Sequence, residues 1–202
     1  MAEIGTDIEK AKELIEAGKL VAVPTDTVYG LAGDSSNETA LSNIFKVKKR
    51  PSDVPLIALS DSIEKLQKMT MKLSSLELKV AEYFWPGALT LIVGKQSNVA
   101  DIMTASLDTI GIRIPANPLS LQLMNLLEIP LAVTSANIHG EPSPLTAHEV
   151  NDQLGSKIKY ILDGGKCAIG EESTIVSIPP EGIKIFREGA ISKKEIEQVM
   201  NS

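Results

Sequence analysis

The sequence predicts a single α/β (α+β) domain over residues 1–202, with an open, twisted sheet of mixed parallel and antiparallel strands flanked by helices. Short Val-, Ile- and Leu-rich runs alternate with helix start signals along the whole chain. The last two runs are separated only by the turn sequence "PPEG", which predicts an antiparallel closing pair. A chain of 202 residues also has the length for one sizeable core.

The helices are predicted from their N-terminal signals. Thr6-x-x-Glu9, Ser74-x-x-Glu77, Thr146-x-x-Glu149 and Ser192-x-x-Glu195 each have the spacing of a capping box. The first is expected to open a helix that ends at Gly18, and Asn37 is expected to cap another. Further helices are expected near residues 61–69, 75–84, 118–127, 146–154 and 192–200.

The strands are predicted from short apolar runs bounded by turn residues. Their ranges are 20–23, 56–59, 89–93, 110–114, 130–133, 159–162, 173–178 and 183–187.

Composition limits the classes of function. The net charge of −6 and the pI of about 5.1 argue against nonspecific binding of nucleic acid, which depends on Lys and Arg. No apolar run reaches the roughly 18 residues of a membrane-spanning helix, and the start "MAEIGTDIEK" is too polar for a secretory signal. One cysteine and two histidines exclude an internal disulfide and an ordinary zinc site, so we expect a cytoplasmic protein without a protein-held metal.

A cationic loop stands out in this acidic chain. In "FKVKKRPSDVPL", Lys46, Lys48, Lys49 and Arg50 lie within five positions. One interpretation is a solvated helix end, and the other is a site for an anion. If the chain is extended near Pro51, Lys48 and Arg50 project to the same side, where an ammonium and a planar guanidinium suit phosphates.

Two polar loops follow strands. "PTDTVYGLAGD" brings Thr25, Thr27 and Asp26 together, either as a hydrogen-bonded turn or as part of a site. "VTSANIHGEPSP" gathers the small hydrogen-bonding residues Ser135 and Asn137 with Ser143, which would let a ligand approach the backbone closely.

Two arginines complete the candidate site. Arg113 lies within an apolar strand and shares a face with Gly111, so it needs an anionic partner, either an internal carboxylate or a ligand. Arg187 follows the last strand, and Ser173 begins the one before it.

These motifs resemble the YrdC-like family in their order. "PTDTVYGL", "KVKKRP", "PGALTLIV", "IGIRIPAN", "TSANIHGEPSP", "STIVSI" and "FREGAI" follow one another as they do there, from about residue 8 to residue 191. The K-x-R pair (Lys48 and Arg50) and the S-x-N pair (Ser135 and Asn137) are the signature of that family. The resemblance implies an open, twisted mixed sheet with a large positive pocket on its concave side.

The resemblance also implies an activity. L-threonine, bicarbonate (or CO2) and ATP, with Mg2+, would give threonylcarbamoyl-adenylate, diphosphate and water, a nucleotidyltransferase reaction. A partner transferase would then move the threonylcarbamoyl group onto tRNA, and any direct contact of this chain with tRNA would be weak. Lys48 and Arg50 would act on the triphosphate as the catalytic cations.

The remaining site residues come from the same resemblance. It places around L-threonine the residues Thr27, Arg113, Val133 and Ser173. It places around ATP the residues Arg50, Val54, Thr109, Ser135, Asn137, Ser143 and Arg187.

One departure from the family pattern bears on function. Leu59 stands where many relatives have a histidine. If that histidine helps to hold threonine, its absence would weaken threonine binding or shift the amino-acid preference. The alternatives are therefore a divergent paralogue that keeps the nucleotide pocket, and an RNA-binding module without catalysis, against which the acidic pI counts.

Overall fold

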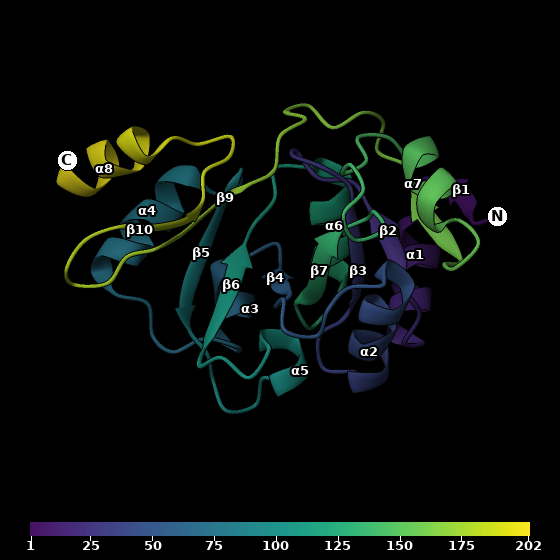
Figure 1. The fold of residues 1–202 in the computed structure, drawn as a ribbon, viewed down its shortest axis with the longest axis horizontal. Helices are drawn as coiled ribbons and strands as arrows, with labels where there is room; N and C mark the ends of the chain where they lie inside the picture. The colour runs from purple at the N-terminus through teal and green to yellow at the C-terminus, as the bar shows by residue number, and fades with distance from the viewer.

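A ten-stranded sheet runs through the whole molecule, with the N-terminus at one end and the C-terminus at the other (Figure 1). The computed structural model describes residues 1–202. The strand order is β1-β8-β2-β3-β7-β4-β6-β5-β9-β10. The strands are β1 (Glu3–Gly5), β2 (Val21–Val23), β3 (Gly30–Asp34), β4 (Ile57–Leu59), β5 (Leu89–Gly94), β6 (Thr109–Arg113), β7 (Leu131–Ser135), β8 (Tyr160–Leu162), β9 (Thr174–Ser177) and β10 (Lys184–Arg187).

The sheet is mixed, as predicted. Parallel pairs join β1 to β8, β2 to β8, β4 to β6 and β5 to β9. The other pairs are antiparallel, including the predicted closing pair β9–β10.

Eight helices flank the sheet, and none is long and apolar enough to cross a membrane. They are α1 (Ile8–Glu16), α2 (Glu38–Lys48), α3 (Ile63–Gln67), α4 (Ser75–Phe84), α5 (Asp101–Thr104), α6 (Pro118–Leu126), α7 (Ala147–Leu154) and α8 (Lys193–Asn201).

The helix caps confirm most of the predicted signals. Full capping boxes form at Ser74 and Ser192, and Asn37 caps α2. Thr146 caps α7, but the Glu149 side chain accepts from the Leu145 amide instead of closing the box. The box expected at Thr6 is wrong, because the Asp7 side chain accepts from the Lys10 amide and caps α1.

Alternation along the strands divides the core into two parts. Ala58, Ile110 and Ile112 point to one face, where they join the larger cluster with residues of α2, α3, α4, α5, α7 and α8. The opposite face carries a smaller cluster in which α1 and α6 pack with β8, β2, β3 and β7, and Leu59 of β4 lies at its margin. The rest of this second face, over β4, β6, β5 and β9, lacks a helical layer and opens into a cavity.

Candidate active site

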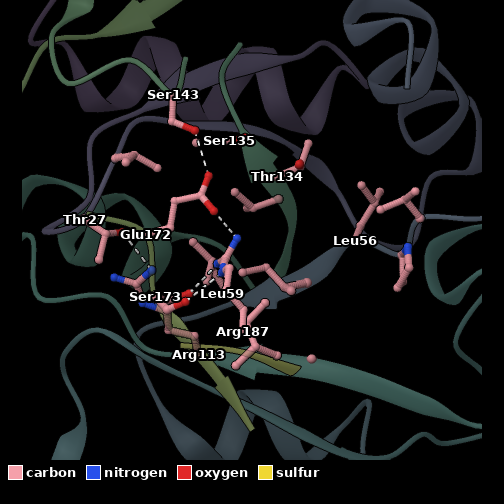
Figure 2. A pocket seen from close by; sticks show the side chains of 18 of the residues that line it. Thr27, Leu56, Leu59, Arg113, Thr134, Ser135, Ser143, Glu172, Ser173 and Arg187 are labelled. Carbon is pink, nitrogen blue, oxygen red and sulfur yellow. Dashed lines mark hydrogen bonds and ion pairs between the residues drawn. The ribbon is translucent and has the colours of Figure 1, made fainter. Parts of the chain in front are cut away.

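The open face of the sheet forms a cavity of about 570 Å3 (Figure 2). Alternate residues of β6, Thr109, Gly111 and Arg113, line it, while Ile110 and Ile112 turn into the core on the other side. Gly111 keeps the floor low, because a Cβ there would lie 2.8 Å from Ile57 Cγ2. The predicted face for Arg113 and Gly111 is therefore confirmed.

Arg113 is buried at one end of this cavity, and each of its three nitrogens donates one hydrogen bond. Its Nη2 donates to Asp26 Oδ1 at 2.7 Å, its Nη1 to Thr27 Oγ1 at 2.9 Å and its Nε to the Gly87 carbonyl at 2.7 Å. Burial lowers the pKa of Arg113, and the Asp26 carboxylate opposes that shift. An internal carboxylate, that of Asp26, is therefore one anionic partner of Arg113. A guanidinium has five N–H donors, so two remain for a ligand.

Lys48 lies differently from its prediction. It is the last residue of α2, and Lys49 after it has a left-handed φ of 54°, so the extended geometry expected near Pro51 is wrong. The Lys48 side chain is buried and does not line the cavity. Its Nζ donates to the Ser135 carbonyl, to the Asn137 carbonyl at 2.6 Å and to Asn137 Oδ1 at 3.0 Å.

The surroundings of Lys48 shift its protonation equilibrium toward the neutral amine. Burial and then the charge of Arg50 lower the pKa of Lys48 to about 7. The three oxygen acceptors fix its position against the loop that follows β7. Lys48 thus supports the cavity wall from behind, and a direct action on a substrate stays a prediction.

Arg50 lies on the cavity surface. Its Nε donates to the Val54 carbonyl at 3.1 Å and its Nη2 to the Pro55 carbonyl at 3.0 Å, which holds the guanidinium over the loop before β4. Burial lowers the pKa of Arg50, and Glu172 counteracts this shift.

Arg187 reaches the cavity through an irregularity in β10. The register passes from Ile185 opposite Val176 to Arg187 opposite Ile175, so the strand bulges at Phe186. A bulge re-aims side chains, and both Phe186 and Arg187 line the cavity. The Arg187 Nε donates to the Ser173 carbonyl at 3.0 Å and its Nη2 to Ser173 Oγ at 3.2 Å.

Sequence reasoning missed Glu172. Its carboxylate lies in the middle of the cavity between Ser143 and Arg187 (Figure 2). It accepts from Ser143 Oγ at 2.8 Å and forms an ion pair with Arg187 Nη1. The available signal was its place directly before Ser173, in a segment that already held predicted site residues.

The structure brings the predicted residues together with one exception. All except Lys48 line the same cavity; these are Thr27, Arg50, Val54, Thr109, Arg113, Val133, Ser135, Asn137, Ser143, Ser173 and Arg187. Leu59 also lines it, directly opposite Arg113 in the register of β4 and β6. The cavity is therefore rich in guanidinium and hydroxyl donors, with an apolar wall at Leu59.

Comparison with known proteins agrees with this arrangement. The model of the Sua5/YciO/YrdC family, described as "Telomere recombination", matches residues 13–189. The threonylcarbamoyl-AMP synthase of Pyrococcus abyssi is 42% identical over 193 residues, 96% of this chain and 57% of that protein. The threonylcarbamoyl-AMP synthase of Bacillus subtilis is 40% identical over 194 residues, 96% of this chain and 56% of that protein. The chain thus spans just over half the length of these two relatives.

A solved structure extends the likeness to three dimensions. P. abyssi Sua5 in complex with L-threonine superimposes with a TM-score of 0.94 at 39% identity, over 98% of this chain and 60% of that one. The family model covers most of the chain, and the predicted motifs meet in one cavity on the same fold. The chain therefore belongs to the Sua5/YciO/YrdC family.

Proposed function

We propose that this protein is a threonylcarbamoyl-AMP synthase, a nucleotidyltransferase that uses L-threonine, bicarbonate (or CO2) and ATP. The observation that carries the proposal is the meeting of three guanidinium groups, from Arg50, Arg113 and Arg187, in one cavity. Two anions, a carbamate and a triphosphate, must approach each other in this reaction, and fixed cations lower the cost of that approach. Similarity to relatives of that name supports the same assignment.

The threonine half of the site is proposed around Arg113. Its two free N–H donors would take the substrate carboxylate, with Thr27 and Ser173 beside it and the main chain at Val133 nearby. Thr27 Oγ1 is already fixed by Arg113 Nη1 and lies 2.9 Å from Thr25 Oγ1, so the hydroxyls there are held in place before a ligand arrives. The relative solved with L-threonine has the same fold, which supports threonine as the substrate.

The nucleotide half is proposed along Arg50, Ser143 and Arg187. Arg50 and Arg187 would neutralise the triphosphate, and Asn137 would hold the loop between them. The remaining proposed contacts to ATP are Val54, Thr109 and Ser135.

The proposed chemistry has two steps. The threonine amine attacks the carbon of bicarbonate, and the adduct loses water to give an N-carboxylate (a carbamate). One oxygen of that carbamate then attacks the α-phosphorus of ATP, the bond to the bridging oxygen breaks, and diphosphate leaves. The chain's own part is to bind, to orient and to balance charge, because neither step requires a covalent intermediate with the protein.

The ATP is proposed to arrive as its Mg2+ complex. The chain has no group of three His, Cys, Asp or Glu residues placed to hold a metal ion. Glu172, the carboxylate in the middle of the cavity, is already bonded to Ser143 and Arg187. This donor set fits a Mg2+ ion carried by the phosphate oxygens of the substrate, where it would reduce the charge of the departing diphosphate.

The product would pass to a partner. A threonylcarbamoyl-adenylate is a reactive mixed anhydride, so we propose a transferase that moves its acyl group onto tRNA. With a net charge of −6, any direct contact of this chain with tRNA would be weak.

The direct test is incubation with MgATP, bicarbonate and labelled L-threonine, with separation of diphosphate and the labelled adenylate. Both products should appear together and only when all three substrates are present. Arg50→Ala should abolish both, whereas Lys49→Ala, an exposed neighbour, should not. Diphosphate release that does not depend on threonine would refute the assignment.

Leu59 supports a second candidate function, that of a paralogue that binds nucleotide and prefers another amino acid. Its side chain is an apolar wall opposite Arg113, so it offers no hydrogen bond to a substrate hydroxyl. Replacing threonine by a panel of amino acids in the same assay separates the two. A preference for an aliphatic amino acid over threonine would select the paralogue.

A further inference from the structure

Glu172 lies on a segment that crosses the sheet. Residues 163–173 connect β8, the second strand of the sheet order, to β9, the ninth. The segment is tied to the loop after β2, because the Ile169 amide donates to the Asp26 carbonyl at 2.9 Å and the Gly170 amide to the Thr27 carbonyl at 3.2 Å. Glu172 follows directly, and its carboxylate points into the cavity (Figure 2).

The two partners of Glu172 come from far apart in the sheet. Ser143 belongs to the loop after β7, in the middle of the sheet order, and Arg187 belongs to the edge strand β10. The carboxylate therefore links two walls of the cavity. The proposed function assigns both partners to the nucleotide half of the site, and Arg187 to the triphosphate.

The donors that these partners turn toward each other are engaged by Glu172. A serine hydroxyl has one hydrogen to donate, and that of Ser143 goes to Glu172 Oε1. Arg187 spends its Nε and Nη2 on Ser173 and turns its Nη1 to Glu172. A phosphate oxygen can use the Ser143 hydroxyl hydrogen and the Nη1 hydrogen that faces Glu172 only after the carboxylate has moved away.

The Glu172–Arg187 pair is also accessible to a competitor. Its side chains are 36% and 39% exposed, whereas those of Asp26 and Arg113 are 6% and 4% exposed. Exposed ion pairs are weak because water solvates both partners. We therefore expect the buried Asp26–Arg113 pair to stay formed, and the exposed Glu172–Arg187 pair to open when another anion competes for Arg187.

We propose that Glu172 is a positioning residue that occupies a phosphate subsite as an internal anion and is displaced by the triphosphate of ATP. In the free protein its two carboxylate oxygens bring the Ser143 and Arg187 donors together on one anionic group. When a phosphate binds, it takes over both donors. This inference rests on the proposed function for the identity of the ligand, but its test uses neither threonine nor turnover.

The probe is inorganic tripolyphosphate, titrated calorimetrically without Mg2+ into the full chain. Glu172→Gln removes the charge of the competitor, and Glu172→Asp keeps the charge but shortens the reach to the two donors. Both variants should bind tripolyphosphate about two- to fivefold more tightly than the wild type, the range expected for loss of an exposed ion pair. If Glu172 only held Arg187 in position for the ligand, both variants would bind tripolyphosphate more weakly than the wild type.

Glu141→Gln is the matched control, because Glu141 also lines the cavity but its side chain bonds to no other residue. It should change the affinity much less than Glu172→Gln. The inference is overturned if the Glu172 variants bind more weakly or equally, if Glu141→Gln has as large an effect, or if tripolyphosphate binds to none of the proteins. Failure of the synthase assay with these results intact would refute the proposed reaction and leave the phosphate subsite standing.

Discussion

The ammonium of Lys48 holds the loop after β7, and its removal gives a measurable loss of stability. Lys48→Met keeps most of the apolar length of the side chain and deletes the three hydrogen bonds to Ser135 and Asn137. The matched control is Lys46→Met, because Lys46 lies in the same helix and is exposed.

The expected size follows from the Ser135 and Asn137 carbonyls, because Asn137 Oδ1 keeps the Ser135 hydroxyl as a donor. Each buried acceptor left without a donor costs about 1–3 kcal/mol. Part of this cost is offset, because a buried ammonium is itself poorly solvated. We expect the free energy of unfolding to fall by about 3 kcal/mol at pH 7, which lowers the melting temperature by roughly 6–12 °C in a domain of this size.

The effect should depend on pH with a defined sign. The pKa of Lys48 is lowered to about 7 from the ordinary 10.5, so between these values the unfolded chain binds one proton more than the folded protein. Stability then rises with pH in this window, by up to about 1.4 kcal/mol per pH unit. Lys48→Met lacks this contribution, and the difference between wild type and variant should grow from pH 7 to pH 9.

Urea denaturation followed by circular dichroism at pH 6, 7, 8 and 9 measures this difference for both variants. Lys46→Met should stay within about 0.5 kcal/mol of the wild type at every pH. A Lys48→Met curve that coincides with the control would show that the three bonds contribute nothing. A large difference that does not change with pH would refute the lowered pKa alone.

Three further predictions concern the ligands and the crossing segment. Arg113→Lys removes the planar fork and the bond to Gly87, so threonine affinity should fall at least about tenfold, and ATP affinity should change little in separate calorimetric titrations; unchanged threonine affinity would make Arg113 purely structural. In turnover assays, 2-aminobutyrate should be rejected more strongly than serine, because a missing hydroxyl leaves polar groups unpaired at a cost of about 1–3 kcal/mol, and equal use of threonine and 2-aminobutyrate would contradict a pocket that reads the hydroxyl. Gly189→Ala places a Cβ 2.2 Å from the Glu172 carbonyl oxygen and 2.9 Å from the Ser173 carbonyl carbon, both backbone atoms. Chemical denaturation should therefore show that the free energy of unfolding falls by about 1–3 kcal/mol. A denaturation midpoint equal to that of the wild type would mean that the segment shifts freely.

The fold was predictable wherever a pattern was local. Apolar runs located eight of the ten strands, because a run of Val, Ile and Leu between turn residues carries its own signal. The two missed strands lack that signal. β1, with the sequence EIG, contains no apolar run, and β3 contains Gly30 and Gly33, which reduce strand propensity. A Cβ at Gly33 would lie 2.9 Å from Leu20 Cδ2, so a larger residue there would make the Leu20 side chain shift.

The site was predictable in membership but not in detail. The order of the loops indicated which residues would meet, and the cavity wall contains all of them except Lys48. The error at Lys48 arose because the helix continues to that residue, which no property of the four cations reveals. Glu172 was missed because its partners Ser143 and Arg187 are 29 and 15 residues away in the chain. Such pairings depend on the path of the chain across the sheet.

The strand order has a consequence for how the protein acquires its shape. β1 and β2, at the start of the chain, both pair with β8, so neither can complete its edge until residues 160–162 have been made. Pairings so distant in sequence slow folding, because a long loop must close before any contact compensates for the lost chain entropy. The cavity draws its wall from segments between Thr25 and Arg187, so no early fragment contains it. The ability to bind ligand should therefore appear only at the last step of folding. Ligands can stabilise newly made chains against unfolding only after that step.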